Sequence, residues 1–274
     1  MNNYELKQTI LCLTNVSAGY GEKIILKGVN LIEKDVVRLG ISATGQVIAV
    51  VGRSGRGKST LFKVLTGLAK PIEGQVLITD CTTEIADDAK EVAEGDVGFV
   101  DQKYTLFRHK TVLQIMNYAL KGSKASKEEK NAMINDLLIK WGMIDHKDKY
   151  PNELSGGQRQ RTAIIEQLLT SKHFMVFDEP FSGLDVGNIE SVKQSFELIQ
   201  SSDELNTIIF STHDIELAVE LADSIYVIGY PDETKAFSTI VKHYDLKEMG
   251  LAWQPFGLQH LELAKQVKVD LMNS

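Results

Sequence analysis

A glycine-rich segment early in the sequence has the residue types and the spacing of a phosphate-binding loop. Residues 52–59, GRSGRGKS, fit the pattern G-x-x-x-x-G-K-[ST]. In this pattern the glycines let backbone N–H groups converge on phosphate oxygens, and the lysine reaches the β- and γ-phosphates of a nucleotide. The hydroxyl of the next residue is a ligand of Mg²⁺. We therefore expect Mg²⁺ at Ser59 and nucleotide contacts from Gly52, Ser54, Gly55, Gly57, Lys58, Ser59 and Thr60.

Two neighbouring acidic residues form a second candidate group. Asp178 and Glu179 directly follow the apolar run at residues 174–177. An Asp at the end of a buried strand can hold Mg²⁺ beside the phosphates, and the Glu after it can orient and deprotonate an attacking water molecule. Two acids after an apolar run are more often a solvated loop. Their pairing with the loop at 52–59 nevertheless indicates a site that hydrolyses a nucleotide.

Apolar runs of strand length must position these residues. Residues 46–52, QVIAVVG, form a continuous apolar run that leads into the glycine loop, and residues 59–69 follow with helical spacing. This order of strand, loop and helix is the context that a phosphate-binding loop requires. Helical patterns separate three later apolar runs, as in an α/β fold with a parallel sheet. These runs are residues 174–177, 207–210 and 224–229.

The N-terminal part of the chain has a different pattern. Short β-branched runs predict strands that are interrupted by glycines, and residues 33–45 predict a long connection to the glycine loop. Two more strand patterns lie between the loop and a helical region. The predicted strands are residues 10–13, 24–26, 29–32, 75–78 and 97–100, and the interrupting glycines are Gly19, Gly21 and Gly28.

Helical spacing continues from residue 111 to residue 141. Ser126 and Glu129 have the spacing of a capping box within this region. The predicted buried face carries Met133, Leu137 and Trp141. The last forty residues are less regular and predict one amphipathic helix packed on this chain, with its apolar face at Leu261, Ala264, Val267 and Leu271.

A second glycine segment has phosphate-binding residue types but no lysine. It is LSGGQRQR at residues 154–161. Other motifs accompany it: Gln102 after the strand pattern at 97–100, SGLD ending at Asp185, His213 in STHD, and Tyr20 near the start. Together with the loop at 52–59, these motifs resemble the ATP-binding subunits of ATP-binding cassette (ABC) transporters. The resemblance covers about residues 10–230.

The resemblance implies an α/β fold, with a P-loop ATPase core built on a parallel sheet. An N-terminal antiparallel β-subdomain and an inserted α-helical subdomain, at about residues 103–165, would complete it. The ATPase domain would span residues 1–230, and residues 231–274 would form a tail with a short helix. The implied cofactors are ATP and Mg²⁺. Two copies of the chain would pair head to tail, so that LSGGQ contacts the ATP held by the partner's loop, which explains why LSGGQ needs no lysine.

The resemblance also implies a role for each matched residue. Gln102 would contact the metal or the attacking water, and His213 would hold the γ-phosphate and position the water of Glu179. Tyr20 would stack on adenine, although a tyrosine in a glycine-flanked turn can simply pack there. Lys58, Gln102, Glu179 and His213 would therefore be catalytic, Asp185 would cross the dimer interface, and the partner's nucleotide would be contacted by Ser155, Gly156, Gly157 and Gln158.

The composition agrees with a subunit that acts through a separate membrane partner. The 274 residues carry a formal net charge of −7, which disfavours nucleic acid as a partner. The two cysteines, Cys12 and Cys81, lack metal-ligand spacing and favour a reducing compartment. No run approaches the roughly 18–20 apolar residues of a membrane span. The resemblance thus implies a separate permease and a cytoplasmic position on the inner face of the cell membrane.

Alternatives to transport remain at this stage. A cytosolic ABC ATPase of repair, translation or iron–sulfur assembly would carry the same motifs, whereas a GTPase or small kinase would share only the phosphate loop. The apolar residues Tyr104, Leu106 and Phe107 beside Gln102 could dock a permease or belong to an ordinary core. The sequence departs from the family pattern at Arg53, Arg56, Asp101 and Glu166, the last of which replaces a common Arg. The cargo is not encoded in any of these residues.

Overall fold

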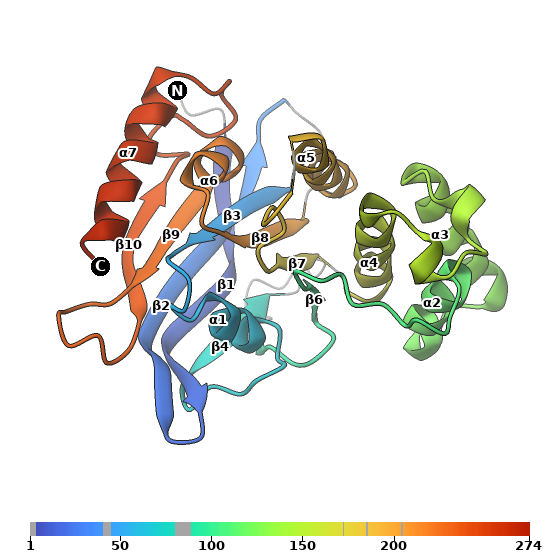
Figure 1. Cartoon of the computed structure of the whole chain (residues 1–274), viewed down its shortest axis with the longest axis horizontal. Helices are drawn as coiled ribbons and strands as arrows, with labels where there is room; N and C mark the ends of the chain where they lie inside the picture. Colours follow the sequence, from blue (N-terminus) through green and yellow to red (C-terminus); the bar gives the residue numbers. More distant parts are fainter. Residues whose placement is uncertain (1–3, 41–44, 80–88, 172, 185, 204) are drawn as a thin grey trace.

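The computed structural model describes most of the chain (Figure 1). It covers residues 4–40, 45–79, 89–171, 173–184, 186–203 and 205–274, without the side chains of residues 186 and 188. Cys81, Asp185 and residues 41–44 of the predicted connection therefore lie outside the described residues.

A six-stranded sheet forms the centre of the molecule, in the order β10-β9-β3-β8-β7-β6. All neighbouring pairs are parallel except β10 and β9, which are antiparallel. Every residue of β3, β7, β8 and β9 is buried, as expected for strands covered on both faces. The predicted parallel sheet is confirmed. Its strands are β3 (Gln46–Val51), β6 (Val97–Val100), β7 (Phe174–Phe177), β8 (Thr207–Thr212), β9 (Ser224–Gly229) and β10 (Thr239–Asp245).

A four-stranded antiparallel sheet confirms the predicted N-terminal β-subdomain. Its order is β2-β1-β4-β5, with β1 (Tyr4–Tyr20), β2 (Lys23–Arg38), β4 (Glu73–Thr79) and β5 (Ala89–Glu91). Three details of the prediction were wrong. Gly19 does not interrupt a strand, because it lies inside β1 and pairs with Ile24. Gly28 lies inside β2 at φ 61°, where the register with β1 shifts. Residues 33–38 are not a connection, because they continue β2 in register with the start of β1.

Helices cover the sheets and extend to one side (Figure 1). Among the described helices, none has the length and apolar character needed to cross a bilayer. The 3₁₀ turns at 120–122, 144–146 and 151–153 connect three of the helices. The helices are α1 (Lys58–Leu65), α2 (Val112–Ala119), α3 (Lys127–Lys140), α4 (Gly156–Thr170), α5 (Val186–Gln200), α6 (Ile215–Leu221) and α7 (Leu258–Met272).

Helix α3 begins as predicted but buries a different face. The Glu129 N–H donates to Ser126 Oγ at 3.2 Å, and the Ser126 N–H donates to Glu129 Oε2 at 2.7 Å, which confirms the capping box. Trp141 is buried and Leu137 packs against the core, as predicted, whereas Met133 is exposed, and Ile134 and Leu138 are buried instead. Both sets of residues recur at helical spacing, so the period alone could not choose between them.

Two apolar cores lie on the two faces of the central sheet. One fills the space between the two sheets around Phe62 of α1. The other lies under the helices and contains Phe177, Phe196 and Phe210, whose ring centroids lie 5.0–5.5 Å apart. Because both faces are covered, the carboxyl ends of the parallel strands are where polar side chains can gather.

The C-terminal segment is tied to the same sheet. Strand β10 was not predicted, and it pairs along β9. Helix α7 packs on this chain as expected, with Ala264, Val267 and Leu271 buried, although Leu261 is partly exposed and Leu263 is buried instead. After β10, the buried Lys247 ammonium donates to Ser224 Oγ at 2.8 Å and lies 3.9 Å from Glu33 Oε2. This ammonium therefore joins the C-terminal segment to β9 and β2.

We expect Lys247→Met to lower the free energy of unfolding by about 3 kcal/mol, because it leaves the buried Glu33 without its cation. Burial raises the pKa of Glu33, and the charge of Lys247 opposes this shift. The matched control is Lys268→Met, which breaks an exposed pair with Glu216 and should cost less than about 1 kcal/mol. Urea unfolding measures both, and equal losses would contradict the role of Lys247.

Candidate active site

The predicted catalytic residues meet at the carboxyl ends of three parallel strands. Lys58 begins α1 after β3, Glu179 follows β7, and His213 follows β8. These strands are neighbours in the order β3-β8-β7, so their ends bring together residues that lie far apart in the sequence. The arrangement corresponds to the ligand-binding edge of an open α/β sheet.

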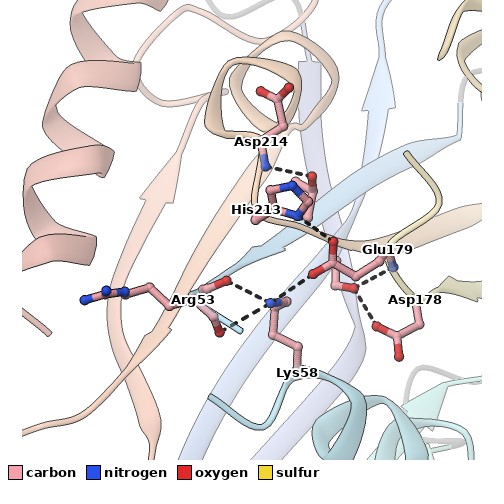
Figure 2. Close-up of polar contacts among 9 residues, drawn as sticks. Arg53, Lys58, Asp178, Glu179, His213 and Asp214 are labelled. Carbon is pink, nitrogen blue, oxygen red and sulfur yellow. Dashed lines mark hydrogen bonds and ion pairs between the residues drawn. The ribbon is translucent and has the colours of Figure 1, made fainter. Parts of the chain in front are cut away.

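Lys58 lies at the centre of this group (Figure 2). Its buried ammonium donates to the carbonyl oxygen of Gly52 at 2.8 Å and lies 3.5 Å from that of Arg53. It also forms an ion pair with Glu179 Oε1 at 3.0 Å. The side chain of Arg53 points away from these contacts (Figure 2). The ammonium thus holds the glycine loop against the end of β7.

The glycines of the loop are required by its backbone. Gly55 and Gly57 have φ angles of 80° and 91°, which residues with a Cβ rarely adopt. A Cβ at Gly52 would lie 2.3 Å from Cγ2 of Ile228 in β9. The loop can therefore pack on the sheet and turn directly into α1, whose first residues, Lys58, Ser59 and Thr60, line the site.

Glu179 is held in a strained conformation by hydrogen bonds that the sequence analysis missed. Its φ angle is 51°, an uncommon value for a residue other than glycine. The Glu179 N–H donates to Ser211 Oγ at 2.8 Å, and the Ser211 hydroxyl donates to Asp178 Oδ1 at 2.7 Å. Glu179 Oε2 lies 2.8 Å from Nδ1 of His213, which donates to the carboxylate when it carries the proton. The only sequence signal for Ser211 was its place in the motif STHD, two residues before His213.

A cavity of about 430 Å³ brings most of the predicted residues together. Two lining residues, Ile25 and Ser182, were not predicted as site residues. The size suits a nucleotide, since ligand pockets usually measure about 300–1,000 Å³. The predicted residues that line it are Tyr20, Ser54, Gly55, Gly57, Lys58, Ser59, Thr60, Gln102, Glu179 and His213.

Tyr20 lies at the exposed margin of this cavity. Its hydroxyl accepts a hydrogen bond from Lys63 Nζ at 3.3 Å, and the same ammonium lies 5.3 Å from the ring centroid. Thr60 and Lys63 lower the pKa of the Tyr20 hydroxyl. Because the residue is 53% exposed, its ring is available to stack on a flat ligand such as a base.

The other predicted residues that the structure describes do not line the cavity. The carbonyl oxygen of Gly52 accepts from Lys58, and Asp178 joins the site through Ser211. Residues 154–158, which we call the LSGGQ segment, lie at the start of α4, apart from α1 in Figure 1. None of its described residues lines the cavity of its own chain.

The LSGGQ segment forms a capping box at the start of α4. The Gln158 N–H donates to Ser155 Oγ at 3.2 Å, and the Ser155 N–H donates to Gln158 Oε1 at 2.9 Å. The Gln158 amide also contacts Nε2 of His146 at 2.9 Å. Ser155 and Gly156 are exposed, so the segment presents the N-terminus of a 15-residue helix to the outside. A helix N-terminus of this kind favours an anion.

The oxygen donors at the site fit Mg²⁺. Within the described part of the chain, no group of three or more His, Cys, Asp or Glu side chains could hold a metal by itself. Mg²⁺ is usually bound by one or two carboxylates together with substrate phosphates and water, rather than by an all-protein cage. The hydroxyl of Ser59 and the carboxylate of Asp178, oriented by Ser211, belong to this donor class, as does the amide oxygen of Gln102.

The fold is similar to solved ABC ATPase structures. It aligns with cbiO1 from Clostridium perfringens, described as part of the ABC transporter complex cbiONQ, with a TM-score of 0.70 and 24% identity over 97% of both chains. It also aligns with an ATP-binding subunit of an ABC transporter, with a TM-score of 0.67 and 20% identity over 96% of this chain and 100% of the other.

Curated relatives are similar in sequence as well. The chain is 35% identical to a sulfate/thiosulfate import ATP-binding protein CysA of Thermosynechococcus vestitus, over 80% of this chain and 61% of the relative. It is 37% identical to the arginine transport ATP-binding protein ArtM of Bacillus subtilis, over 77% of this chain and 83% of the relative. The match to CysA of Synechococcus elongatus spans 53% of that protein. The profile of the family described as ABC transporter matches residues 37–182. The chain therefore belongs to the ABC transporter family, as an ATP-binding subunit.

Proposed function

We propose that this chain binds ATP with Mg²⁺ and hydrolyses it as a head-to-tail dimer, and so powers an ABC transporter through a separate permease. One observation carries the proposal. The phosphate-binding features are divided between two places: the Lys58 cavity is one, and the exposed N-terminus of α4 at the LSGGQ segment is the other. A second copy can bring these two places together, whereas a single chain keeps them apart.

The loop and Lys58 would bind the phosphates. Backbone N–H groups at the start of α1 and the Lys58 ammonium would surround the β- and γ-phosphates. Ser59, Asp178 and Gln102 would hold Mg²⁺, which neutralises developing charge on the phosphate oxygens when it is bound. Tyr20 would support the adenine at the margin of the cavity. A phosphate that reaches Lys58 would pair with its ammonium alongside Glu179, or would displace Glu179 from it.

Glu179 would accept the proton of the attacking water. Its carboxylate lies between two partners, with one oxygen on Lys58 and the other on His213. When the γ-phosphate competes for Lys58, Oε1 of Glu179 becomes free to bind water. The contact between Oε2 and His213 meanwhile keeps the carboxylate oriented. His213 is largely exposed toward the cavity and can contact the γ-phosphate as well.

The partner subunit would complete the site from the opposite side. The N–H groups of Gly156 and Gly157 and the Ser155 hydroxyl would donate to the γ-phosphate of the other chain. Asp185 would cross the dimer interface. Since ADP lacks the γ-phosphate, it loses these contacts, and the closed dimer reopens after hydrolysis.

A membrane-spanning permease is the partner that family membership favours, which would place the chain on the cytoplasmic face of a membrane. The matched relatives carry names of different cargoes, sulfate or thiosulfate in one case and arginine in the other, so no cargo is proposed. The surface after Gln102 could contact the permease. Tyr104 and Leu106 pack against the core there, whereas Phe107 is 38% exposed beside Tyr118, with ring centroids 5.0 Å apart.

We expect Ser211→Ala to lower ATP turnover about 10- to 100-fold, because it removes the hydroxyl that orients Asp178 and Glu179. The matched control is Ser195→Ala, a buried serine of α5 whose hydroxyl donates only to the Ser191 carbonyl. Steady-state ATPase assays at saturating Mg²⁺ measure both. If the two variants kept equal rates, Ser211 would have no positioning role.

We expect Glu179→Gln to bind ATP normally but to hydrolyse it at least about 100-fold more slowly, the contribution of a general base. With ATP and Mg²⁺ the variant should elute as a stable dimer in gel filtration. Turnover at the wild-type rate would remove Glu179 from the mechanism, and a monomeric ATP-bound variant would contradict the dimer.

The transport role is tested by co-purification. The tagged Glu179→Gln variant is recovered from detergent-solubilised membranes with ATP, and its companions are identified by mass spectrometry. A stoichiometric protein with several membrane spans is expected. An ATP-bound dimer recovered without such a protein would instead assign the ATPase to a soluble process.

A further inference from the structure

A second, smaller pocket lies on the other side of the turn that carries Gln102. It measures about 180 Å³ and is formed between the end of β6 with its following turn and the middle of α4. We call it the α4 pocket. Its polar lining residues are Asp101, Tyr104, Thr105, Glu166 and Gln167.

Most polar groups of the α4 pocket already have partners. The Asp101 carboxylate accepts from the Thr105 N–H at 3.0 Å and from the Thr105 hydroxyl at 2.6 Å. Gln167 Oε1 accepts from the Phe99 N–H at 3.1 Å. The Tyr104 hydroxyl donates to the carbonyl oxygen of Pro180 at 3.2 Å. These contacts are made within the chain and leave the groups no need of a ligand.

Glu166 differs from these residues. Among the described residues, no hydrogen bond or ion pair reaches its carboxyl group, and the Thr170 hydroxyl donates to its backbone carbonyl oxygen at 3.2 Å. Burial alone raises the pKa of Glu166 to about 7. Glu166 is half-buried, so its carboxyl is only partly solvated, and a donor from another molecule would add a hydrogen bond that this chain does not supply.

The size and charge of the α4 pocket indicate what kind of donor fits. At about 180 Å³ it is smaller than the roughly 300–1,000 Å³ of small-molecule sites, and it suits the end of one side chain. Its lining contains two carboxyl groups and no Lys or Arg. A cationic side chain would therefore gain a charge-assisted hydrogen bond from Glu166 without meeting a like charge.

The position of the α4 pocket connects it to the nucleotide. Asp101 lines the α4 pocket, and the next residue, Gln102, lines the nucleotide cavity. Tyr104, at a φ angle of 47°, completes the turn and contacts Pro180, which directly follows Glu179. A side chain that fills the α4 pocket thus contacts the turn that carries Gln102. The same turn contacts Pro180, the residue after Glu179.

We propose that the permease inserts a Lys or Arg side chain of a cytoplasmic segment into the α4 pocket, where it pairs with Glu166. The inference rests on the proposed transport function and specifies the chemistry of the contact. Glu166 then selects a permease by charge. An apolar side chain of the partner at this position would leave the carboxyl unpaired, and an acidic side chain would be repelled by it.

The test measures binding of the purified chain to the permease recovered by co-purification and reconstituted in nanodiscs. We expect Glu166→Gln to weaken binding about 10-fold. Glu166→Lys should weaken it about 100-fold or more, because the new ammonium would lie next to the cationic side chain of the permease and repel it. The control is Glu262→Lys, which makes the same charge change on an exposed position of α7. It should bind as the wild type does.

A charge exchange makes the test specific. Each Lys and Arg of the permease's cytoplasmic segments is changed to Glu, and one such variant should recover the binding of the Glu166→Lys chain. The inference is overturned if Glu166→Lys binds with wild-type affinity, or if no permease variant recovers it. If the wild-type chain binds no permease at all, the proposed transport function fails instead.

Discussion

The contacts of the Lys58 ammonium are the interaction on which the rest of the site depends. Its oxygen partners come from the glycine loop after β3 and from Glu179 after β7. A buried ammonium needs such partners, because an unpaired charge in the interior costs several kcal/mol. The pairing therefore fixes the loop relative to Glu179. Through the second oxygen of Glu179 it also fixes His213 after β8.

Helix α4 connects this site to two other surfaces. Its N-terminus carries the LSGGQ segment, where Ser155 and Gly156 are exposed and which does not line the cavity of its own chain. Its middle carries Glu166 and Gln167, which line the pocket behind the turn of Gln102. One helix thus presents one end to the outside and one side to the turn that carries Gln102. In our proposals, this arrangement lets ATP, the dimer and the permease influence one another.

Local patterns predicted much of the fold and of the site, because their residues act through near neighbours. Local backbone conformation determines the residue types of the glycine loop and of the capping box of α3. Burial on both faces determines those of the fully buried strands. Features that depend on distant contacts were missed. Ser211 is recognisable only from its bonds to Asp178 and Glu179, more than thirty positions away. Strand β10 has no alternating pattern, and its pairing with β9 defines it.

The most direct test of a site shared between two chains mixes two inactive variants, both in the Glu179→Gln background. Lys58→Ala disables the loop, and Gly157→Asp disables the LSGGQ segment. The side chain added at Gly157 fits, because its Cβ would meet only Ser191 Oγ, at 3.9 Å, among the described residues. A carboxylate is compatible with a helix N-terminus, and it repels phosphate.

Retention of labelled ATP on a dimer is measured by gel filtration. Neither variant should retain ATP alone, and the mixture should, because one site then combines two intact halves. Retention of ATP by the Gly157→Asp variant alone, at the level of the mixture, would show that each chain binds ATP by itself and would contradict the account.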